Sequence, residues 1–259
     1  MKEPVIPSQF LSEDPEAARL HAVGLQAQLA GDHDQALATL NTAAAILEGR
    51  SSLSRQVQLA RIARDTGFTY VRQAVSSEVP ALLDDSEGML GYSQRLTEAA
   101  MEGNEFICLT DAAAGGSIMA REMRREVLAE HGATLSLLGR SATVRAVLLD
   151  VDTRGRGETA RHKRTEEQRW YDRNYAHGYL KEGNNGYYLV SNAVHGARQE
   201  ILNGQRLRAG KWLVRAVEGL AWTTKNDRRN LAPAQKTFAD RLPSLRSYEA
   251  AKASVLAKP

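Results

Sequence analysis

The sequence predicts an all-helical protein, and three observations support this prediction. Apolar residues recur at spacings of three and four through most of the chain, whereas the alternation typical of strands is scarce. Turn-forming glycines and Asp residues separate the periodic segments. The composition, 42% hydrophobic and 25% charged over 259 residues, is that of an ordinary globular protein with a sizeable core.

Composition also excludes several classes of protein. The single cysteine, Cys108, cannot form an intramolecular disulfide or a cysteine-based zinc site. Residues 1–16 carry three prolines and four acidic residues where a signal peptide needs an apolar run, and no stretch approaches 18 apolar residues. We therefore expect a cytoplasmic protein without membrane spans, and nothing in the sequence indicates a cofactor or a metal.

The first two helices are expected to form a hairpin. One apolar face of the first consists of Leu20, Val23 and Ala27, and Gly31 supplies the turn. Asp32 or Asp34 can cap the second helix with its side-chain oxygen. The apolar face of that second helix consists of Leu37, Leu40, Ala44 and Leu47.

The remaining helices follow from the same periodicity. They are expected near residues 53–74, 89–102, 117–138, 141–151, 165–182, 187–203, 206–224 and 233–257.

The hairpin at 17–50 resembles a tetratricopeptide repeat (TPR). Leu20 takes the first large position of that pattern, Val23 and Gly24 the Leu-Gly pair, and Ala27 the Tyr position, while Ala36 and Leu40 match the Ala-x-x-x-Phe element. The Trp, Tyr and terminal Pro of the pattern are absent. Small residues at Gly24 and Ala36 would let the two helices cross closely.

Similar glycines recur downstream within helical patterns, at Gly67, Gly132, Gly178 and Gly219, with turns expected at Gly139 and at 183–186. Each glycine inside a helix costs about 1 kcal/mol relative to alanine, and close helix packing would offset that cost. We therefore expect a TPR-like right-handed superhelix of about five antiparallel helix pairs. An irregular helical bundle is the alternative.

Charge divides the chain into two halves. Residues 1–150 hold 13 Lys and Arg against 20 Asp and Glu, and residues 151–259 hold 21 against 11. We expect acidic helical repeats at 1–151, a basic flexible linker at 152–166 and basic helices at 167–259. Such polarity favours a polyanion partner, or attraction between the two halves within one chain or head to tail in a homo-oligomer.

The basic half offers candidate phosphate ligands. Arg169, Arg173 and Lys181 recur on one face of the helix expected at 165–182, opposite a tyrosine ridge of Tyr171, Tyr175 and Tyr179, so stacking of bases beside arginine is disfavoured. A second basic stripe contains Arg208, Lys211 and Arg215. Either stripe can bind backbone phosphates or form a solvated helix face.

Signatures of enzymes are weak. The sequence contains no Gly-rich phosphate loop, no HExxH and no GxSxG motif. Arg125 and His131 form an Arg-x5-His arrangement that resembles the motif of the HEPN ribonucleases, in which Arg and His act around the scissile phosphate. Glu126 replaces the usual polar residue after the arginine.

The leading hypothesis is a non-enzymatic protein that binds a peptide or protein partner in a concave groove, as the TPR resemblance implies. Gln28, Arg64 and Arg72 are the candidate groove residues. RNA or DNA binding through the basic half is the alternative, and a HEPN-like ribonuclease is a distant third.

Overall fold

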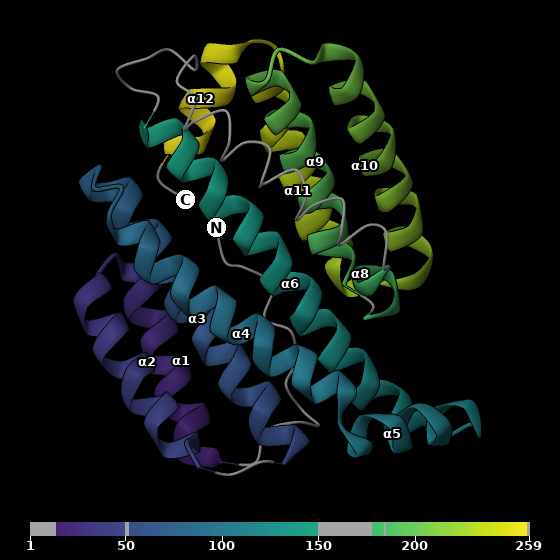
Figure 1. Ribbon diagram of the computed structural model, residues 1–259. Coiled ribbons are helices and arrows are strands. Elements are labelled where there is room, and N and C mark those ends of the chain that lie inside the picture. The colour runs from purple at the N-terminus through teal and green to yellow at the C-terminus, as the bar shows by residue number, and fades with distance from the viewer. Residues whose placement is uncertain (1–13, 50–51, 150–177, 184, 258–259) are drawn as a thin grey trace.

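The computed structural model describes residues 14–49, 52–149, 178–183 and 185–257, and every regular element in these ranges is a helix (Figure 1). The first six are α1 (Pro15–Ala30), α2 (His33–Leu47), α3 (Leu53–Ser77), α4 (Leu82–Glu102), α5 (Asn104–Ala114) and α6 (Ile118–Leu149). The others are α8 (Tyr179–Glu182), α9 (Gly186–Leu202), α10 (Arg206–Asn226), η1 (Arg228–Asn230), α11 (Leu231–Arg241), η2 (Leu242–Leu245) and α12 (Tyr248–Leu256). The predicted all-helical class is therefore confirmed for the described residues.

The hairpin of α1 and α2 forms as the sequence predicts. Gly31 ends α1 in the left-handed conformation, with φ of 85°, which suits glycine because it has no Cβ. Of the two candidate caps, Asp32 is the N-cap, and its Oδ1 accepts a hydrogen bond from the backbone N–H of Gln35 at 3.1 Å.

Close helix crossings repeat in three antiparallel hairpins, α1/α2, α3/α4 and α9/α10. A Cβ added to Gly24 would lie 2.8 Å from Leu40 Cγ, and one added to Gly67 would lie 2.8 Å from Leu90 Cγ. In the third hairpin, a Cβ on Gly196 would lie 2.6 Å from the Trp212 ring. A glycine on the first helix thus faces a large side chain on the second in each hairpin.

Helix α6 runs through the middle of the molecule, with α3 and α4 on one side and α9 and α12 on the other (Figure 1). The predicted break at Gly139, between helices at 117–138 and 141–151, is wrong. Gly139 is buried inside one continuous helix, and buried residues such as Leu138 and Ala142 continue the apolar face on both sides of it. Burial of that face offsets the helix-weakening effect of glycine.

The C-terminal region is more divided than predicted. The single helix expected at 233–257 is instead α11, η2 and α12. Pro243 lacks a backbone N–H and cannot continue an α-helix, and Ser247 starts α12 by accepting a hydrogen bond from Ala250 N at 3.1 Å. Helix α4 also starts earlier than expected, at Leu82.

Several predictions fall outside the described residues. These include the linker at 152–166, most of the helix expected at 165–182, and the residues Arg169, Tyr171, Arg173 and Tyr175. Gly178 is described, but it is not inside a helix as predicted. It precedes α8 in the left-handed conformation, with φ of 66°. None of the described helices is long and apolar enough to cross a membrane.

Candidate functional site

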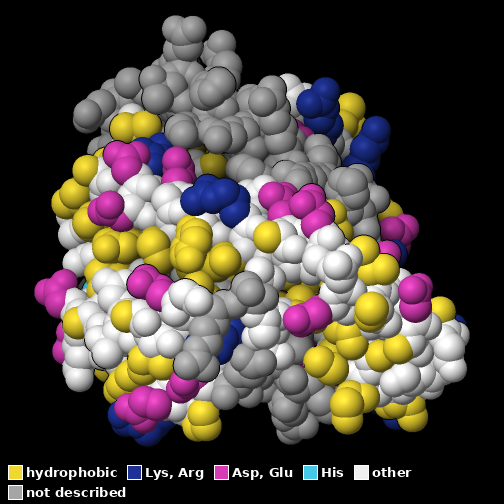
Figure 2. Space-filling view, turned by 60° about the horizontal axis from the view of Figure 1, so that its bottom comes forward, with side chains coloured by type: hydrophobic (Ala, Val, Ile, Leu, Met, Phe, Trp, Pro, Cys, Tyr) yellow, Lys and Arg dark blue, Asp and Glu magenta, His cyan; other side chains and the backbone are white. Residues whose placement is uncertain are grey.

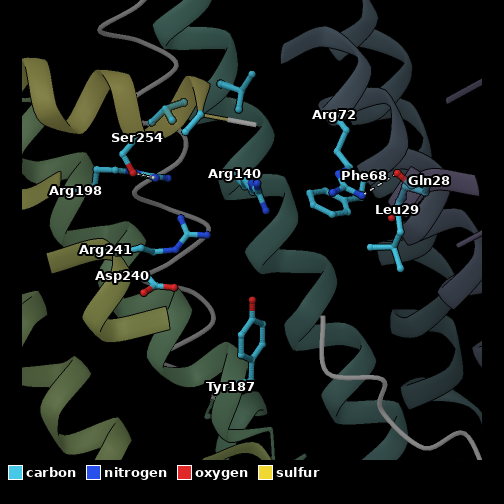
Figure 3. Close-up of a pocket in the computed structure, with 13 residues that line it drawn as sticks. Gln28, Leu29, Phe68, Arg72, Arg140, Tyr187, Arg198, Asp240, Arg241 and Ser254 are labelled. Atoms are coloured by element: carbon cyan, nitrogen blue, oxygen red, sulfur yellow. Dashed lines mark hydrogen bonds between the residues drawn. The ribbon is translucent and has the colours of Figure 1, made fainter. Parts of the chain in front are cut away.

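A pocket lies between the N-terminal hairpins and the C-terminal helices (Figure 3). Its volume is about 250 Å³. Helices α1 and α3 form one wall, α9, α11 and α12 form the opposite wall, and α6 lies between them. The described residues that line the pocket are Gln28, Leu29, Phe68, Arg72, Arg140, Val144, Tyr187, Arg198, Asp240, Arg241, Ser254, Val255 and Ala257.

Four arginines from four helices bring positive charge to this pocket, namely Arg72 of α3, Arg140 of α6, Arg198 of α9 and Arg241 of α11. In the described part of the lining, Asp240 is the only acidic residue, and it is exposed to solvent. Figure 3 shows the side chains of Arg140 and Arg241 and the Tyr187 hydroxyl pointing into the space between the walls. Guanidinium groups at this density favour a ligand that carries negative charge.

Phe68 positions two of the arginines. Arg72 follows Phe68 by four residues on α3, so both side chains lie on one helix face, and its guanidinium carbon lies 5.7 Å from the centre of the ring. The guanidinium carbon of Arg140 lies 4.7 Å from the same ring centre. Both contacts are cation–π interactions, and they hold side chains of α3 and α6 at the pocket wall.

The pKa of His195, on the α9 side of the pocket, is lowered in part by the positive charges of the pocket arginines. Burial lowers the pKa of His195 well below its ordinary value of 6.5, and the charges of Arg198, Arg241 and Arg140 lower it further. Nη2 of Arg198 donates a hydrogen bond to Nδ1 of His195. Because an arginine can only donate, Nδ1 accepts, and the imidazole is neutral with its proton on Nε2.

On the opposite wall, Gln28 connects the pocket to the protein interior. Its backbone oxygen accepts a hydrogen bond from Arg72 Nη1 at 3.1 Å. Its side-chain Nε2 donates to Thr69 Oγ1 at 2.7 Å and to the backbone oxygen of Asp65 at 3.2 Å. These bonds fix α1 against α3 and set the position of Arg72.

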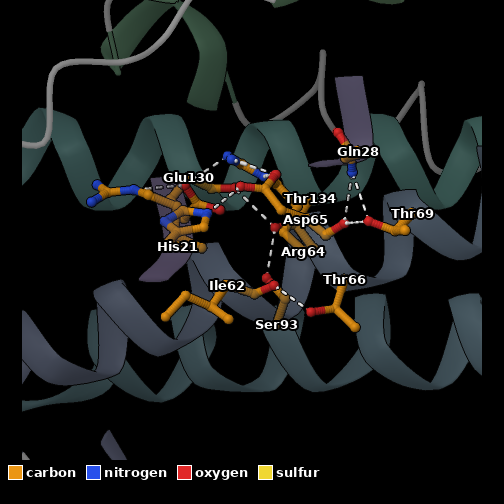
Figure 4. Close-up of polar contacts among 11 residues, drawn as sticks. His21, Gln28, Ile62, Arg64, Asp65, Thr66, Thr69, Ser93, Glu130 and Thr134 are labelled. Carbon is orange, nitrogen blue, oxygen red and sulfur yellow. Dashed lines mark hydrogen bonds and ion pairs between the residues drawn. The ribbon is translucent and has the colours of Figure 1, made fainter. Parts of the chain in front are cut away.

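Behind this wall, a buried network of charged side chains joins α3 to α6 (Figure 4). Nη1 of Arg64 lies 2.8 Å from Glu130 Oε2, and Nη2 of Arg64 lies 2.9 Å from Asp65 Oδ1. Nε2 of His21, on α1, lies 2.7 Å from Asp65 Oδ2. Nε of Arg61 lies 3.4 Å from Glu130 Oε2, and Nη2 of Arg61 lies 3.8 Å from Glu126 Oε2.

The charges around Arg64 and Asp65 favour the ionised form of both side chains. Burial raises the pKa of the Asp65 carboxyl, but the charge of Arg64 and the hydrogen bond from His21 outweigh burial and hold it below its ordinary value. Burial lowers the pKa of Arg64, but the charges of Asp65 and Glu130 outweigh burial and raise it. Removing one partner of such a buried pair leaves an uncompensated charge and costs about 3–5 kcal/mol. The network therefore supports the pocket wall structurally.

The three residues expected to line a partner groove lie in two places. Gln28 and Arg72 both line the pocket. Arg64 lies on the same helix as Arg72 but is buried in the charged network, where it contacts Asp65 and Glu130 and holds α3 against α6.

Arg125 and His131, the ribonuclease-like pair, lie apart on α6. His131 is 0% exposed, its Nδ1 lies 2.8 Å from Thr97 Oγ1, and its ring packs edge-on against Tyr179 with the ring centres 4.6 Å apart. Arg125 is half-buried at the surface and forms an ion pair with Glu122. A buried histidine cannot reach a phosphate at the surface, so this geometry does not favour the ribonuclease interpretation.

The candidate phosphate ligands that are described lie on α8 and α10. Lys181, Arg208 and Lys211 are exposed, and Arg215 is half-buried with its guanidinium carbon 4.4 Å from the centre of the Trp212 ring. Arg208, Lys211 and Arg215 share one side of α10, as their spacing predicts. The other two residues of the predicted ridge, Arg169 and Arg173, lie outside the described residues.

Sequence reasoning missed Arg140, Arg198, Arg241 and His195. Arg140 follows Gly139, which the sequence suggested as a turn, and Arg198 and Arg241 stand in segments without a recognisable motif. Arg140, Arg198 and Arg241 come together only because α9 packs on α6 and α11 packs on α9, and spacing along the sequence does not indicate such packing. The one local signal among these four residues was the spacing of three between His195 and Arg198 on α9, whose side chains form a hydrogen bond.

The pocket combines positive charge with apolar walls, and this arrangement suits binding of a small anionic group. Across the described ranges, no cluster of three His, Cys, Asp or Glu side chains could hold a metal ion. Comparisons of the chain with protein-family models, with curated proteins and with solved structures give no significant match.

Proposed function

We propose that this chain is a non-enzymatic binding protein that holds an acidic residue of a peptide or protein partner in the arginine-lined pocket. The observation that carries the proposal is the convergence of Arg72, Arg140, Arg198 and Arg241 on one pocket. The hairpins α1/α2 and α3/α4 belong to a TPR-like arrangement in this proposal, and the partner enters along their surface.

The size of the pocket supports an amino-acid side chain as the occupant. Pockets for drug-sized ligands usually enclose roughly 300–1,000 Å³, whereas this one encloses about 250 Å³. It therefore suits one carboxylate side chain or a chain-terminal carboxylate with its neighbouring atoms. Leu29, which is exposed at the pocket edge, offers an apolar contact for the residue next to the acidic one.

The test is an array of nine-residue peptides in which each peptide with a central Asp or Glu is paired with its Asn or Gln counterpart. Acidic peptides should bind and their amide counterparts should not. Arg140→Gln should weaken binding at least about tenfold, because it removes one charge-assisted hydrogen bond from a partly desolvated site. Arg246→Gln makes the same charge change at an exposed site away from the pocket, and it should bind like the wild type.

Equal binding of acidic and amide peptides, or equal binding by the Arg140→Gln and Arg246→Gln variants, would contradict the proposal. Calorimetric titration with inorganic phosphate separates the pocket's general affinity for anions from recognition of a peptide. The proposal requires the acidic peptide to bind more tightly than phosphate does.

Nucleic-acid binding is a second, less supported proposal. Arg208 and Lys211 are exposed on α10, but large exposed apolar side chains of the same helix adjoin them. Apolar side chains do not contribute to the binding of phosphates. Fluorescence anisotropy with mixed-sequence RNA and duplex DNA across a salt series tests it. Tight binding that falls steeply with salt and is lost in Arg208→Gln/Lys211→Gln would favour it.

A further inference from the structure

Helix α10 exposes an apolar stripe along its outer face. Leu207 is 90% exposed, Val214 is 58% exposed and Val217 is 56% exposed. Gly210 and Ala221, also exposed, continue the stripe, since these five positions share one face of a helix. Scattered apolar residues on a surface are ordinary, but a continuous stripe marks an interaction surface.

This stripe does not belong to the core that α10 forms with its neighbours. The inner face of α10, with Ala209, Trp212, Ala216, Gly219 and Thr223, is buried and packs mainly on α9. The apolar side chains of the outer face therefore take no part in the packing of α10 on the described helices.

Basic side chains run beside the apolar stripe. Lys211, Arg215 and Arg208 occupy the adjoining part of the helix surface, and residues 206–226 hold five Lys and Arg against one Glu. A partner for this surface should combine apolar side chains with carboxylates.

The chain carries such a surface where α5 meets α6. Ile118 is 73% exposed, Met119 is 64% exposed and Ile107 is 51% exposed, and Figure 2 shows hydrophobic side chains gathered at this end of the molecule, toward the lower right. Residues 102–119 hold three acidic residues and no Lys or Arg. Glu105 accepts a hydrogen bond from Leu53 N at 2.9 Å, whereas Glu102 and Asp111 are exposed, and Asp111 follows Ile107 by one turn of α5.

We propose that the outer face of α10 in one copy of this chain docks on the α5/α6 corner, residues 102–119, of a second copy. Both surfaces carry three large exposed apolar side chains, and their charges are of opposite sign. Within one molecule α5 packs on α6 and α4, while α10 packs on α9, α11 and η1. In this contact, the basic half of one copy attracts the acidic half of another.

Because the two surfaces differ, the contact is made either twice across a two-fold axis or once per copy in a ring or chain. Few side chains take part, so we expect a concentration-dependent association in roughly the micromolar range. Salt should weaken it, because exposed charges are screened beyond about 10 Å at 0.1 M ionic strength.

A complementation experiment tests the contact. The first variant carries Leu207→Gln, Val214→Gln and Val217→Gln, and the second carries Ile107→Gln, Ile118→Gln and Met119→Gln. Sedimentation velocity at a concentration of about 100 μM should show that the wild type associates and that each variant alone is monomeric. A 1:1 mixture should form a dimer and nothing larger, since one intact surface remains on each variant.

The mixture also controls for folding, because a variant that fails to fold cannot complement the other. Val79→Gln/Leu242→Gln, which replaces exposed apolar residues elsewhere, should associate like the wild type. A monomeric wild type at low salt would overturn the proposal. So would variants that still associate alone, or a mixture that remains monomeric although both variants melt cooperatively.

Cross-linking locates the contact independently. Cys108 is exposed on α5 beside Ile107, and Val214→Cys adds a thiol to the α10 stripe. Mild oxidation should join Cys108 of one copy to position 214 of another, in a peptide that mass spectrometry identifies. Val79→Cys is the matched control, and cross-linking of Val214→Cys no greater than that of Val79→Cys would contradict the docking.

Discussion

At the scale of single residues, His195 is the most informative group, because its charge state depends on the pocket. It is neutral in the fold and faces Arg198 of its own helix, Arg241 of α11 and Arg140 of α6. Between its lowered pKa and the ordinary value of 6.5, the unfolded chain binds a proton and the folded chain does not. The contribution of His195 to the free energy of unfolding therefore falls as the pH drops below about 6.5.

We predict that His195 titrates well below pH 6.5 and that filling the pocket with an anion raises its pKa. The negative charge would offset that of the arginines, which now disfavour protonation. The measurement is the pH titration of the imidazole Cε1–H signal by NMR, assigned with His195→Gln, with and without an acidic peptide from the array.

Arg140→Gln supplies the control for this titration. Removing one nearby positive charge should raise the pKa of His195 in the absence of any ligand, while His195 remains buried. A titration that neither the peptide nor this variant moves would show that burial alone sets the pKa, and the pocket would then lack the positive potential described above.

At the scale of helices, glycine has opposite effects at two positions. A Cβ on Gly196 would lie 2.6–2.8 Å from the buried Trp212 ring, whereas a Cβ on Gly88, exposed on α4, would meet nothing within 4 Å. We predict that Gly196→Ala lowers the unfolding free energy by about 1–3 kcal/mol, the usual cost of overpacking. Gly88→Ala should raise it by up to about 1 kcal/mol through helix propensity. Urea unfolding followed by circular dichroism measures both, and a stabilising Gly196→Ala would contradict the close crossing.

The helices also show what the sequence could predict. The α1/α2 hairpin was predictable because its cap, turn and crossing glycine lie within about 30 residues. The predicted break at Gly139 was wrong because burial of the apolar side chains on both sides of it outweighs the low helix propensity of glycine. Gly196 was overlooked, although it precedes its contact Trp212 by sixteen residues, the same interval that separates Gly24 from Leu40. At the site, Gln28 and Arg72 were chosen because they lie on the first helices of two successive hairpins, α1 and α3, whereas Arg140, Arg198 and Arg241 depend on the packing of distant helices.

At the scale of the whole molecule, one apolar cluster crosses the charge division of the sequence. It contains Leu83 and Leu90 of α4, Leu135 and Val147 of α6, and residues of α9 and α12, including Leu202 and Val255. Burial in a shared cluster couples the elements that form it. We therefore expect the acidic and basic halves to unfold together, in one transition.

Leu83→Ala tests this coupling, because Leu83 is fully buried in the acidic half while all three tryptophans lie in the basic half, at positions 170, 212 and 222. A buried Leu→Ala change costs about 2–5 kcal/mol. Tryptophan fluorescence and circular dichroism should report the same shift in the urea midpoint, and Val79→Ala, at an exposed position outside the proposed contact, should leave both unchanged. If Leu83→Ala moved only the circular dichroism transition and left the fluorescence midpoint in place, the halves would be independent units. A pocket built from both walls could then open without unfolding either of them.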